Sequence, residues 1–362
     1  MKKVAILVPD LSLGGGQRVA LNTAELLAKT YTVHVVVFTK KDQLFKTPIK
    51  IIDLNISKKK TIFGKIITIY KRVRSFKKLQ RKENYDVTIS FLESANLCAF
   101  LSNRKKSILT LHCKPELLTS FDQIVLRRLL RYCKNIIAVS NGLKLSVEQE
   151  YKLSNISVIN NSIDCKTIIN EANEFSFQHP RKFIVAIGRL YPEKQFSLMI
   201  DIFSQSVASN EYDLVIIGDG DEFESLSTKI KKVACSVHLL GEKKNPYPIL
   251  KEAELLVMTS KLEAFPMVLL ESLALNTPVI AFDCPTGLHD IIVHNNNGLL
   301  IENSNSDQFT QVLDSVLYDD DLMMKLSKNC RVSVEKFSPD IILQEWQSKI
   351  EDVSTTNQLN EK

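Results

Sequence analysis

Two glutamates in the second half of the chain, Glu263 and Glu271, are separated by seven residues. An apolar run, 255–258, precedes the first, and a helix-like run, 267–275, carries the second. The pattern predicts one carboxylate on a loop after a strand and the other about two turns along the next helix. The amides at the start of that helix would attract an anion such as phosphate. Carboxylates accept from hydroxyls and amides donate to phosphate, so this arrangement suits a phosphorylated sugar.

Two cations, Arg189 and Lys194, follow another apolar run, 183–187. Arginine offers a planar fork of donors and lysine a mobile point charge, so the two could converge on one diphosphate. The alternative is a pair of exposed cations on an ordinary strand-to-helix loop. Their position after a strand, like that of Glu263, places all three at one edge of a parallel sheet and favours the binding role.

Three glycines, 14–16, stand between the first apolar run and the first helix-like segment. Gly15 and Gly16 could let the backbone approach a phosphate, and the alternative is a tight turn. The run does not fit Gly-x-Gly-x-x-Gly, because Val19 takes the place of the last glycine. The second strand ends in Thr39-Lys40-Lys41, without an acid to hold a ribose hydroxyl, which disfavours a nicotinamide dehydrogenase.

Continuous apolar runs alternate with amphipathic stretches along the whole chain, which is typical of parallel sheets covered on both faces. The first series of expected strands is Val4–Val8, Val33–Phe38, Val87–Phe91, Ile108–Leu111, Ile136–Val139 and Ile156–Ile159. The second series is Phe183–Ile187, Leu214–Ile217, Val237–Leu240, Leu255–Met258, Pro278–Phe282 and Gly298–Ile301. We therefore expect an α/β protein with two doubly wound, Rossmann-like domains facing a central cleft.

A chain of 362 residues is long for a single core, so a division into domains is expected. A polar stretch that ends near His179-Pro180 marks the linker. The expected parts are a first domain over residues 1–167, the linker over 168–181, a second domain over 182–337, a C-terminal helix over 338–352 that could return to the first domain, and a disordered tail over 353–362.

The net charge of +6 conceals an asymmetry between the two halves. Residues 1–165 hold 29 lysines and arginines against 12 acids, a net charge of +17, whereas the rest holds 18 against 29, a net charge of −11. The first half is therefore expected to seek an anionic partner.

The seven cysteines include no Cys-x-x-Cys pair, which disfavours a zinc ribbon and indicates reduced thiols in the cytoplasm.

The segment Ser57–Lys82 contains eleven lysines and arginines and no acid. Its apolar residues recur at helical spacing and predict a helix with one apolar stripe, made of Ile62, Ile66, Ile69, Val73 and Phe76. Its cationic face could lie on an anionic membrane leaflet through Lys71, Arg72, Arg74, Lys77 and Lys78. The alternative is a solvated helix whose stripe packs on its own domain. Nucleic acid is disfavoured, because few aromatic residues accompany the charge.

Together these features resemble a retaining glycosyltransferase of family 4, with the GT-B architecture. The resemblance covers nearly the whole chain and rests in addition on Leu214–Gly220 and Cys284–Ile292. It implies transfer of a hexose or N-acetylhexosamine from a nucleotide-diphosphate sugar to an acceptor hydroxyl, with the anomeric configuration kept. A uridine diphosphate donor is expected. Family members usually need no metal, so neither a metal nor an organic cofactor is expected.

The resemblance also implies a role for each matching residue. Arg189 and Lys194 would hold the donor diphosphate, with Gly15 and Gly16 closing over it. Glu263 would hold hydroxyls of the transferred sugar and Glu271 those of the ribose, and the base would lie near Gly241. The helix start would reach the distal phosphate and the sugar at Phe265, Pro266, Met267 and Val268. His112 would lie near the sugar, unless it is a structural histidine, and the implied catalytic set is His112, Arg189, Lys194 and Glu263.

Three positions depart from the family pattern. Gln195 and Ala264 stand where glycine is frequent, and Leu288-His289-Asp290 stands where Pro-x-Glu is frequent. The first two add side chains near the expected phosphates. They bear on the fit of the donor more than on the reaction.

The cationic first half suggests a membrane-associated acceptor, such as a lipid-linked intermediate of a bacterial surface polysaccharide, teichoic acid or glycolipid. The expected location is the cytoplasm, on the inner face of the cell membrane. The alternatives are a nucleotide-sugar epimerase or a phosphorylase on the same fold, or a non-catalytic protein that binds sugar nucleotides or lipids. An epimerase would consume donor without an acceptor, and a phosphorylase would need a pyridoxal cofactor.

Overall fold

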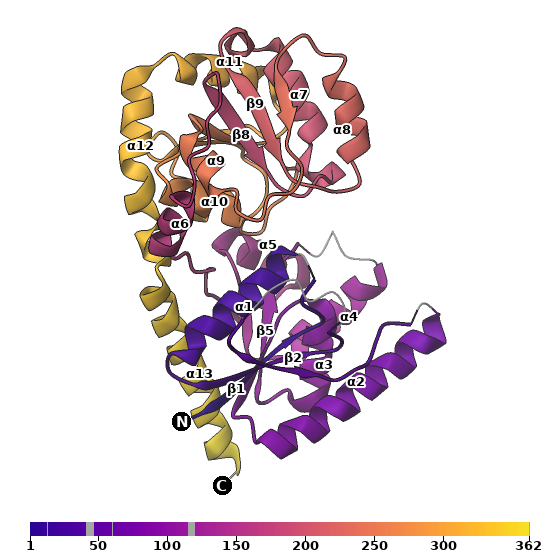
Figure 1. Ribbon diagram of the computed structural model, residues 1–362. Helices are drawn as coiled ribbons and strands as arrows, with labels where there is room; N and C mark the ends of the chain where they lie inside the picture. Colours follow the sequence, from indigo (N-terminus) through magenta and orange to yellow (C-terminus); the bar gives the residue numbers. More distant parts are fainter. Residues whose placement is uncertain (13, 41–46, 60, 115–119, 362) are drawn as a thin grey trace. The chain divides into compact units, whose positions relative to one another are not determined.

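The computed structural model describes residues 1–12, 14–40, 47–59, 61–114 and 120–361. The chain divides into two compact units (Figure 1). Unit 1 consists of Met1–Ser162 together with Pro339–Lys362, and unit 2 consists of Ile163–Ser338. Each unit is built on its own parallel sheet, so the predicted α/β class with two Rossmann-like domains is confirmed.

The described part of unit 1 contains a seven-stranded sheet in the order β3-β2-β1-β4-β5-β6-β7, with every pairing parallel. Its strands are β1 Lys3–Val8, β2 Thr32–Val37, β3 Lys50–Asp53, β4 Val87–Ser90, β5 Ser107–Leu111, β6 Ile136–Ala138 and β7 Ile156–Val158. Its helices are α1 Gly15–Ala28, α2 Ile62–Glu83, α3 Glu93–Asn103, α4 Ser120–Tyr132, α5 Asn141–Tyr151 and α13 Pro339–Glu361.

The described part of unit 2 contains a six-stranded parallel sheet in the order β10-β9-β8-β11-β12-β13. Its strands are β8 Phe183–Ile187, β9 Asp213–Ile217, β10 Val237–Leu239, β11 Leu255–Met258, β12 Val279–Phe282 and β13 Gly298–Ile301. Its α-helices are α6 Cys165–Ala172, α7 Phe196–Gln205, α8 Phe223–Ile230, α9 Tyr247–Glu252, α10 Met267–Ala274, α11 Ser306–Leu317 and α12 Asp320–Val334. Short 3₁₀ turns are η2 Pro192–Lys194, η3 Val207–Asn210, η4 Leu288–Asp290 and η5 Glu335–Phe337.

The continuous apolar runs form strands because both faces of each sheet are covered. All residues of β4, β5, β9, β11 and β12 are buried, so an alternating pattern is not needed. The sequence analysis missed β3, an edge strand that pairs with β2 and is only half buried. Its short apolar dipeptide, Ile51-Ile52, gives too weak a signal to separate it from a loop.

The structure differs from the expected domain boundaries at two places. Helix α6 covers residues 165–172 and lies within unit 2, although 165–167 were expected in the first domain and 168–172 in the linker. Asp164 caps this helix by accepting from the amides of Lys166 and Thr167. The expected disordered tail, 353–362, instead continues α13 to Glu361. Helix α13 belongs to unit 1 and packs against α1, with Trp346, Ile350 and Val353 buried, so apolar contacts hold the helix as far as the start of the expected tail.

Each sheet reverses its strand order at one point, between β1 and β4 in unit 1 and between β8 and β11 in unit 2. Helices leave the two central strands on opposite sides there, so the loops at the carboxyl ends separate and leave room for a ligand. The loops that carry the predicted site residues follow these strands: Gly15 follows β1, Arg189 follows β8, and Glu263 follows β11.

Glycines hold the loops after β8, β9 and β10 against one another. The amide of Gly188 donates to Ile217 and that of Gly218 donates to Gly241, both at 3.0 Å. Gly218 has φ +153°, and a Cβ there would lie 1.8 Å from the carbonyl oxygen of Gly188. A side chain at position 218 would therefore push apart the loop that carries Arg189.

We expect Gly218→Ala to lower the free energy of unfolding by at least about 2 kcal/mol, because it combines a disfavoured φ with a backbone clash. Urea unfolding monitored by circular dichroism measures this change. Gly15→Ala is the matched control, since a Cβ there would meet no described atom within 4 Å. Equal unfolding midpoints for the two variants would show that the loops of unit 2 adjust freely.

Candidate active site

The loops after β8 and β11 are joined by backbone and side-chain hydrogen bonds. The amide of Lys261 donates to the carbonyl of Glu193 at 2.8 Å. The hydroxyl of Thr259 lies 3.3 Å from the carbonyl oxygen of Lys194 and 3.2 Å from that of Gln195. These contacts fix the position of Lys194 relative to the loop that carries Glu263, so the two loops form one preorganised surface.

Lys194 and Glu263 form an ion pair on this surface through Nζ and Oε1. The pair is mostly covered, with 29% of the lysine side chain and 11% of the glutamate side chain exposed. A lysine ammonium has three donors and a carboxylate has two oxygens. The ion pair therefore holds both side chains in place, while Lys194 keeps donors and Glu263 keeps an acceptor oxygen for a ligand.

Arg189 follows β8 on the same loop and is exposed. Its guanidinium carbon lies 5.1 Å from the centre of the Tyr191 ring. An exposed guanidinium beside an aromatic ring keeps its fork of donors available for a phosphate. Tyr191 was not singled out from the sequence, because a single tyrosine in a loop carries no spacing signal.

The loop 263–266 leads directly into α10 and is fastened to the run after β12. The amide of Glu263 donates to Pro285 at 2.9 Å, and the amides of Thr286 and Gly287 donate back to Glu263 at 2.9 and 3.0 Å. A Cβ on Gly287 would lie 1.8 Å from the carbonyl oxygen of Ala264, so this position requires glycine. The sequence analysis noted the run but did not assign this packing role.

The predicted set of helix-start donors needs one correction. Pro266 is the residue that precedes α10, and proline has no N–H to donate. Amide donors in this set can come only from Phe265, Met267 and Val268. Phe265 is buried and stacks edge-on with Phe337 at 5.4 Å, which anchors the start of the helix.

Glu271 lies on α10 and is largely buried, with 6% of its surface exposed. The Tyr247 hydroxyl donates to its Oε1 at 3.2 Å. Tyr247 begins α9 and is itself buried, so it orients the carboxylate. The sequence analysis missed Tyr247 because only the tertiary fold brings α9 against α10.

Gln195 and Ala264, which stand where glycine is frequent in the family, differ from each other in the sign of φ. Gln195 has φ +54° and ψ +38°, the left-handed region that favours glycine, which explains why a glycine is common there. Its side-chain oxygen is buried without a hydrogen-bond partner among the described residues. Ala264 does not have a positive φ, so its position does not require glycine for conformational reasons.

In unit 1 the glycine loop begins α1, as predicted. Gly14 precedes the helix, and the Asp10 carboxylate shapes the loop by accepting from the amide of Ser12 at 3.1 Å. Leu92, which follows β4, has φ +70° and would meet a Cβ on Gly16 at 2.8 Å. The Leu92 side chain therefore lies against Gly16, and the strained Leu92 backbone follows β4 at the point where the strand order of this sheet reverses.

His112 follows β5 and is held by two neighbours. Its Nε2 lies 2.8 Å from the Thr110 hydroxyl, and its ring stacks on Phe91 at 5.2 Å. The Thr110 hydroxyl donates to the Ser90 carbonyl at 2.7 Å, so it must accept from His112. Nε2 then carries the proton, so Nδ1 is the acceptor nitrogen of the ring. Burial lowers the pKa of His112 to about 4, so the ring is neutral at physiological pH.

The predicted membrane residues lie on α2, but one of them does not face outward. Arg72 is buried, donates from Nε and a terminal nitrogen to the Ile56 carbonyl at 3.3 and 3.1 Å, and stacks over Phe38 at 4.0 Å. Including it was therefore wrong, because its charge is used inside unit 1. The others, Lys71, Arg74, Lys77 and Lys78, are exposed.

Among the described helices, none has the length and apolar content that a membrane span requires.

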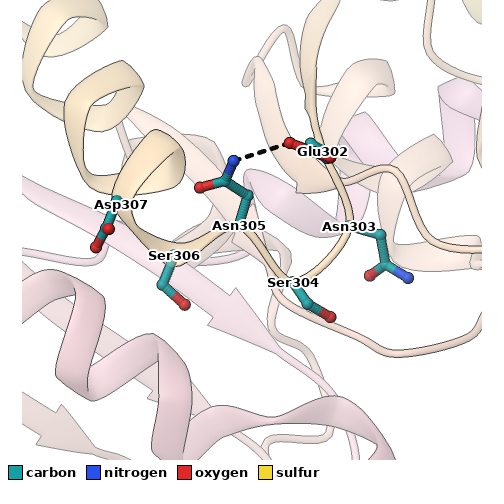
Figure 2. A pocket seen from close by; sticks show the side chains of 6 residues that line it. All are labelled: Glu302, Asn303, Ser304, Asn305, Ser306 and Asp307. Carbon is teal, nitrogen blue, oxygen red and sulfur yellow. Dashed lines mark hydrogen bonds between the residues drawn. The ribbon is translucent and has the colours of Figure 1, made fainter.

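A hollow in unit 2 is formed by the turn after β13, and it differs from the site described above. Its residues are Glu302, Asn303, Ser304, Asn305, Ser306 and Asp307. Figure 2 shows their side chains spread along the turn rather than directed at a common point. Asn305 donates to Glu302 at 2.9 Å and caps α11 through the amide of Gln308. The polar groups thus serve the turn and the helix.

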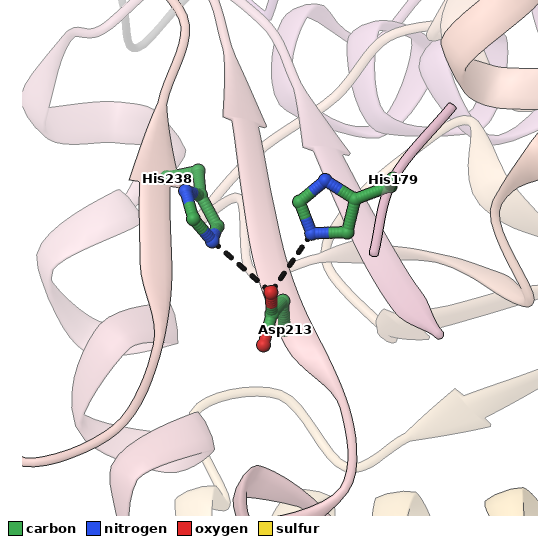
Figure 3. Close-up of side chains that lie close together, drawn as sticks. All are labelled: His179, Asp213 and His238. Atoms are coloured by element: carbon green, nitrogen blue, oxygen red, sulfur yellow. Dashed lines mark hydrogen bonds and ion pairs between the residues drawn. The ribbon is translucent and has the colours of Figure 1, made fainter. Parts of the chain in front are cut away.

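A second polar cluster lies at the amino ends of the strands, the opposite edge of the sheet from Arg189. His179 and His238 point to the same oxygen of Asp213, at 2.8 and 3.1 Å (Figure 3). A terminal nitrogen of Arg181 lies 3.0 Å from the other oxygen, but its alignment is poor, so this contact is chiefly ionic. The three residues are the one group in the described chain with metal-ligand spacing. The imidazole donors and the guanidinium already neutralise the carboxylate, which indicates a structural role.

The electrostatic balance at Asp213 is stabilising. Burial alone would raise its pKa, but hydrogen bonds from His179, His238 and Ser236 and the charge of Arg181 together lower the pKa below its usual value. A carboxyl group with a lowered pKa stabilises the fold at neutral pH. The cluster thus fastens the segment before β8 to β9 and β10.

Two family profiles match consecutive parts of the chain. The profile described as Glycosyltransferase Family 4 matches residues 13–167, and the one described as Glycosyl transferases group 1 matches residues 168–333. Two relatives match over nearly their whole length. One is the GalNAc-alpha-(1->4)-GalNAc-alpha-(1->3)-diNAcBac-PP-undecaprenol alpha-1,4-N-acetyl-D-galactosaminyltransferase of Campylobacter jejuni, 25% identical over 98% of this chain and 99% of the relative. The other is the amylovoran biosynthesis glycosyltransferase AmsD of Erwinia amylovora, 26% identical over 96% of this chain and 99% of the relative.

Solved GT-B structures have the same fold. The HepE protein of Anabaena, in complex with UDP-glucose, superposes with a TM-score of 0.80 at 18% identity and covers 97% of this chain and 100% of its own. At this identity the similarity concerns the fold alone.

We expect His112 to stay neutral, with the proton on Nε2, from pH 8 to about pH 5, because burial disfavours the imidazolium and the Thr110 hydroxyl accepts from Nε2. Nitrogen-15 NMR of histidine-labelled protein reports the tautomer and the titration. His112→Gln identifies the signal by its loss. A titration midpoint above about pH 6 would contradict the effect of burial on the pKa. A neutral ring that carries its proton on Nδ1 would contradict the tautomer.

Asp213→Asn should lower the free energy of unfolding at pH 7 by about 1–3 kcal/mol, because it leaves buried donors without a charged acceptor. Since the folded pKa is lowered, the advantage of the native aspartate is complete above about pH 4 and is lost as the pH falls through the folded pKa. Urea unfolding between pH 7 and pH 3 measures the difference.

The matched control is Asp283→Asn, which disrupts the exposed pair of Asp283 with His289. This change should alter stability by less than about 1 kcal/mol. An equal loss in the two variants would show that burial adds nothing to the Asp213 cluster.

Proposed function

The chain belongs to the family 4 glycosyltransferases, and we propose that it transfers a hexose or N-acetylhexosamine from a uridine-diphosphate sugar to an acceptor hydroxyl with retention of configuration. The observation that supports this most is the pair of Lys194 and Glu263, which the loops after β8 and β11 hold together. A cation for phosphate oxygens and a carboxylate for sugar hydroxyls in contact with each other match the two halves of such a donor.

Stabilisation of the leaving diphosphate is the main catalytic task in this proposal. Arg189 and Lys194 neutralise the charge that develops on the departing oxygen, and the amides at the start of α10 add preorganised dipoles. Glu263 positions the sugar through its hydroxyls, and Glu271, oriented by Tyr247, accepts from the ribose. These groups perform the transfer without a metal ion.

Retention follows in this proposal from attack on the face that the diphosphate leaves, with a phosphate oxygen taking the acceptor's proton. The bond from the anomeric carbon to the acceptor oxygen forms as the bond to the diphosphate breaks. Glu263 and Glu271 then bind rather than act as the flanking pair of a retaining glycosidase. The Campylobacter jejuni relative is named for an alpha linkage, which an alpha-linked donor gives by retention.

The acceptor in this proposal is a lipid-linked glycan, and the product belongs to a bacterial surface polysaccharide or glycolipid. The relatives support it, because one is named for an undecaprenol diphosphate-linked acceptor and another for amylovoran biosynthesis. The net charge of +17 in residues 1–165 suits an enzyme on the inner face of the cell membrane.

A panel of nucleotide sugars tests the donor. The true donor should raise the melting temperature by mass action and be consumed only when a lipid-diphosphate glycan is present. Product anomers are assigned by proton NMR, and inversion would refute the retaining mechanism. Turnover without any acceptor would identify an epimerase, and the absence of both binding and turnover with every donor would refute the proposal.

Arg189→Ala should lower kcat by about 100–1,000-fold, because it removes a donor to the developing charge. The free energy of unfolding should be unchanged, since the side chain is exposed. Lys232→Ala, an exposed cation elsewhere in unit 2, is the control and should retain full activity. Full activity in Arg189→Ala would exclude this residue from diphosphate stabilisation.

A further inference from the structure

Among its described residues, helix α2 buries two polar side chains and exposes three large apolar ones. Its inward face carries Thr68, Arg72 and Phe76, which are buried at positions four residues apart. Arg72 is held by the Ile56 carbonyl, and the Thr68 hydroxyl donates to the Gly64 carbonyl at 2.7 Å. A surface helix normally places its apolar residues inward, so this reversal needs a cause.

The solvent-exposed face of α2 carries three large apolar side chains. Phe63, Ile66 and Tyr70 are 74%, 59% and 62% exposed. Within the predicted apolar stripe, Ile66 is exposed, Ile69 and Val73 are half-buried and Phe76 is buried, so these residues do not form one uniformly covered face. Large apolar side chains that gather on one exposed helical face mark a surface that another apolar phase covers.

The same outward face continues as a row of cations. Arg74, Lys77 and Arg81 are exposed and follow Phe63, Ile66 and Tyr70 at steps of three or four residues. All six side chains therefore lie along one stripe of the helix, apolar in its first half and cationic in its second. We call this stripe the α2 outer face. Tyr70 and Arg74 meet at its middle, where the guanidinium lies 3.3 Å from the phenol oxygen.

We propose that the α2 outer face docks on an anionic lipid bilayer, with Phe63, Ile66 and Tyr70 entering the interface and Arg74, Lys77 and Arg81 binding lipid phosphates. The charge and the apolar character of the α2 outer face together identify a lipid bilayer as its partner. Anionic phosphates next to hydrocarbon complement cations next to exposed apolar side chains. A second copy of the chain is a poorer partner, because residues 1–165 carry a net charge of +17 and would repel their own kind.

Helix α2 is a long, preformed element of unit 1. The helix spans Ile62–Glu83, so it is about 33 Å long at 1.5 Å per residue. It packs against α3 in unit 1 (Figure 1), which fixes its outward direction relative to the sheet. The Thr61 side chain caps its first turn by accepting from the amide of Gly64 at 3.1 Å, so the apolar end is preformed.

The role of docking at α2, which is to bring the enzyme to a lipid-linked acceptor, rests on the proposed function. Docking itself does not depend on it. Binding to vesicles is measured without any sugar donor. Thermal stabilisation by the nucleotide sugar is measured without vesicles. Failure of one measurement therefore leaves the other unaffected.

Flotation of the full chain with vesicles of phosphatidylcholine and phosphatidylglycerol is the primary test. Replacing Phe63, Ile66 and Tyr70 by Ser should lower the bound fraction at least about tenfold through lost apolar burial. Replacing Arg74, Lys77 and Arg81 by Gln should lower the partition constant about 100-fold and weaken its salt dependence. Arg72 is left unchanged, because its replacement would disturb the contact with Ile56.

Met324→Ser with Val332→Ser provides the control, since both side chains are exposed on α12 in unit 2. This control should bind vesicles like the native chain. Unchanged circular dichroism and unchanged donor stabilisation show that each variant is folded. Equal vesicle binding by the native chain and the Ser variant would overturn the proposal.

Insertion has a spectroscopic signature as well. The single tryptophan of the chain, Trp346, is buried, so it contributes a constant background. Phe63→Trp should show a blue-shifted emission with anionic vesicles and quenching by brominated lipid. An unshifted emission would overturn insertion. A native dimer that the Ser variant converts to a monomer, with vesicle binding retained, would assign the α2 outer face to a second copy instead.

Discussion

The contacts that join the loops after β8 and β11 are what the candidate active site depends on. Parallel strands bring their carboxyl ends to one edge of a sheet, and the reversal of strand order separates the two central loops. In unit 2 these loops do not remain independent, because the amide of Lys261 binds Glu193 and the Thr259 hydroxyl lies against the backbone of 194–195. Lys194 and Glu263 can therefore face each other before a ligand arrives.

Preorganisation of this kind has a cost in backbone freedom. Gly218 and Gly287 lie so close to neighbouring carbonyls that a Cβ has no room, and Gln195 occupies the left-handed region without being glycine. Strained or crowded backbone at the edge of the sheet is compensated by the buried strands below it. The same logic applies in unit 1, where Leu92 has a positive φ beside Gly16.

Charged groups serve different purposes at the two edges of the second sheet. At the amino edge, Asp213 is enclosed by two histidines and an arginine, and its charge is used for stability. At the carboxyl edge, Arg189 remains exposed and the pair of Lys194 and Glu263 stays partly open. The charges at the carboxyl edge therefore keep donors and acceptors for a ligand, whereas those at the amino edge are paired with one another. In unit 1, the cations of helix α2 divide between two environments. Arg72 is buried and donates to the Ile56 carbonyl, whereas Arg74, Lys77 and Arg81 are exposed to solvent.

The sequence alone determined the fold class and nearly all the strands. It also predicted the strand-following loops and the helix that carry Arg189, Lys194, Glu263 and Glu271. Those features depend on local patterns: continuous apolar runs for buried parallel strands, and spacing for residues that follow a strand. The family resemblance rested on the same local patterns.

Only the tertiary structure decided which groups meet and which face outward. Tyr247 reaches Glu271 because α9 packs near α10, and α13 joins unit 1 from the end of the chain. The sequence of α2 predicted an apolar stripe and a cationic face, but Phe38 and the Ile56 carbonyl hold Arg72 on the buried face. Periodicity shows that a helix has distinct faces, whereas the contacts of distant segments determine which face is buried.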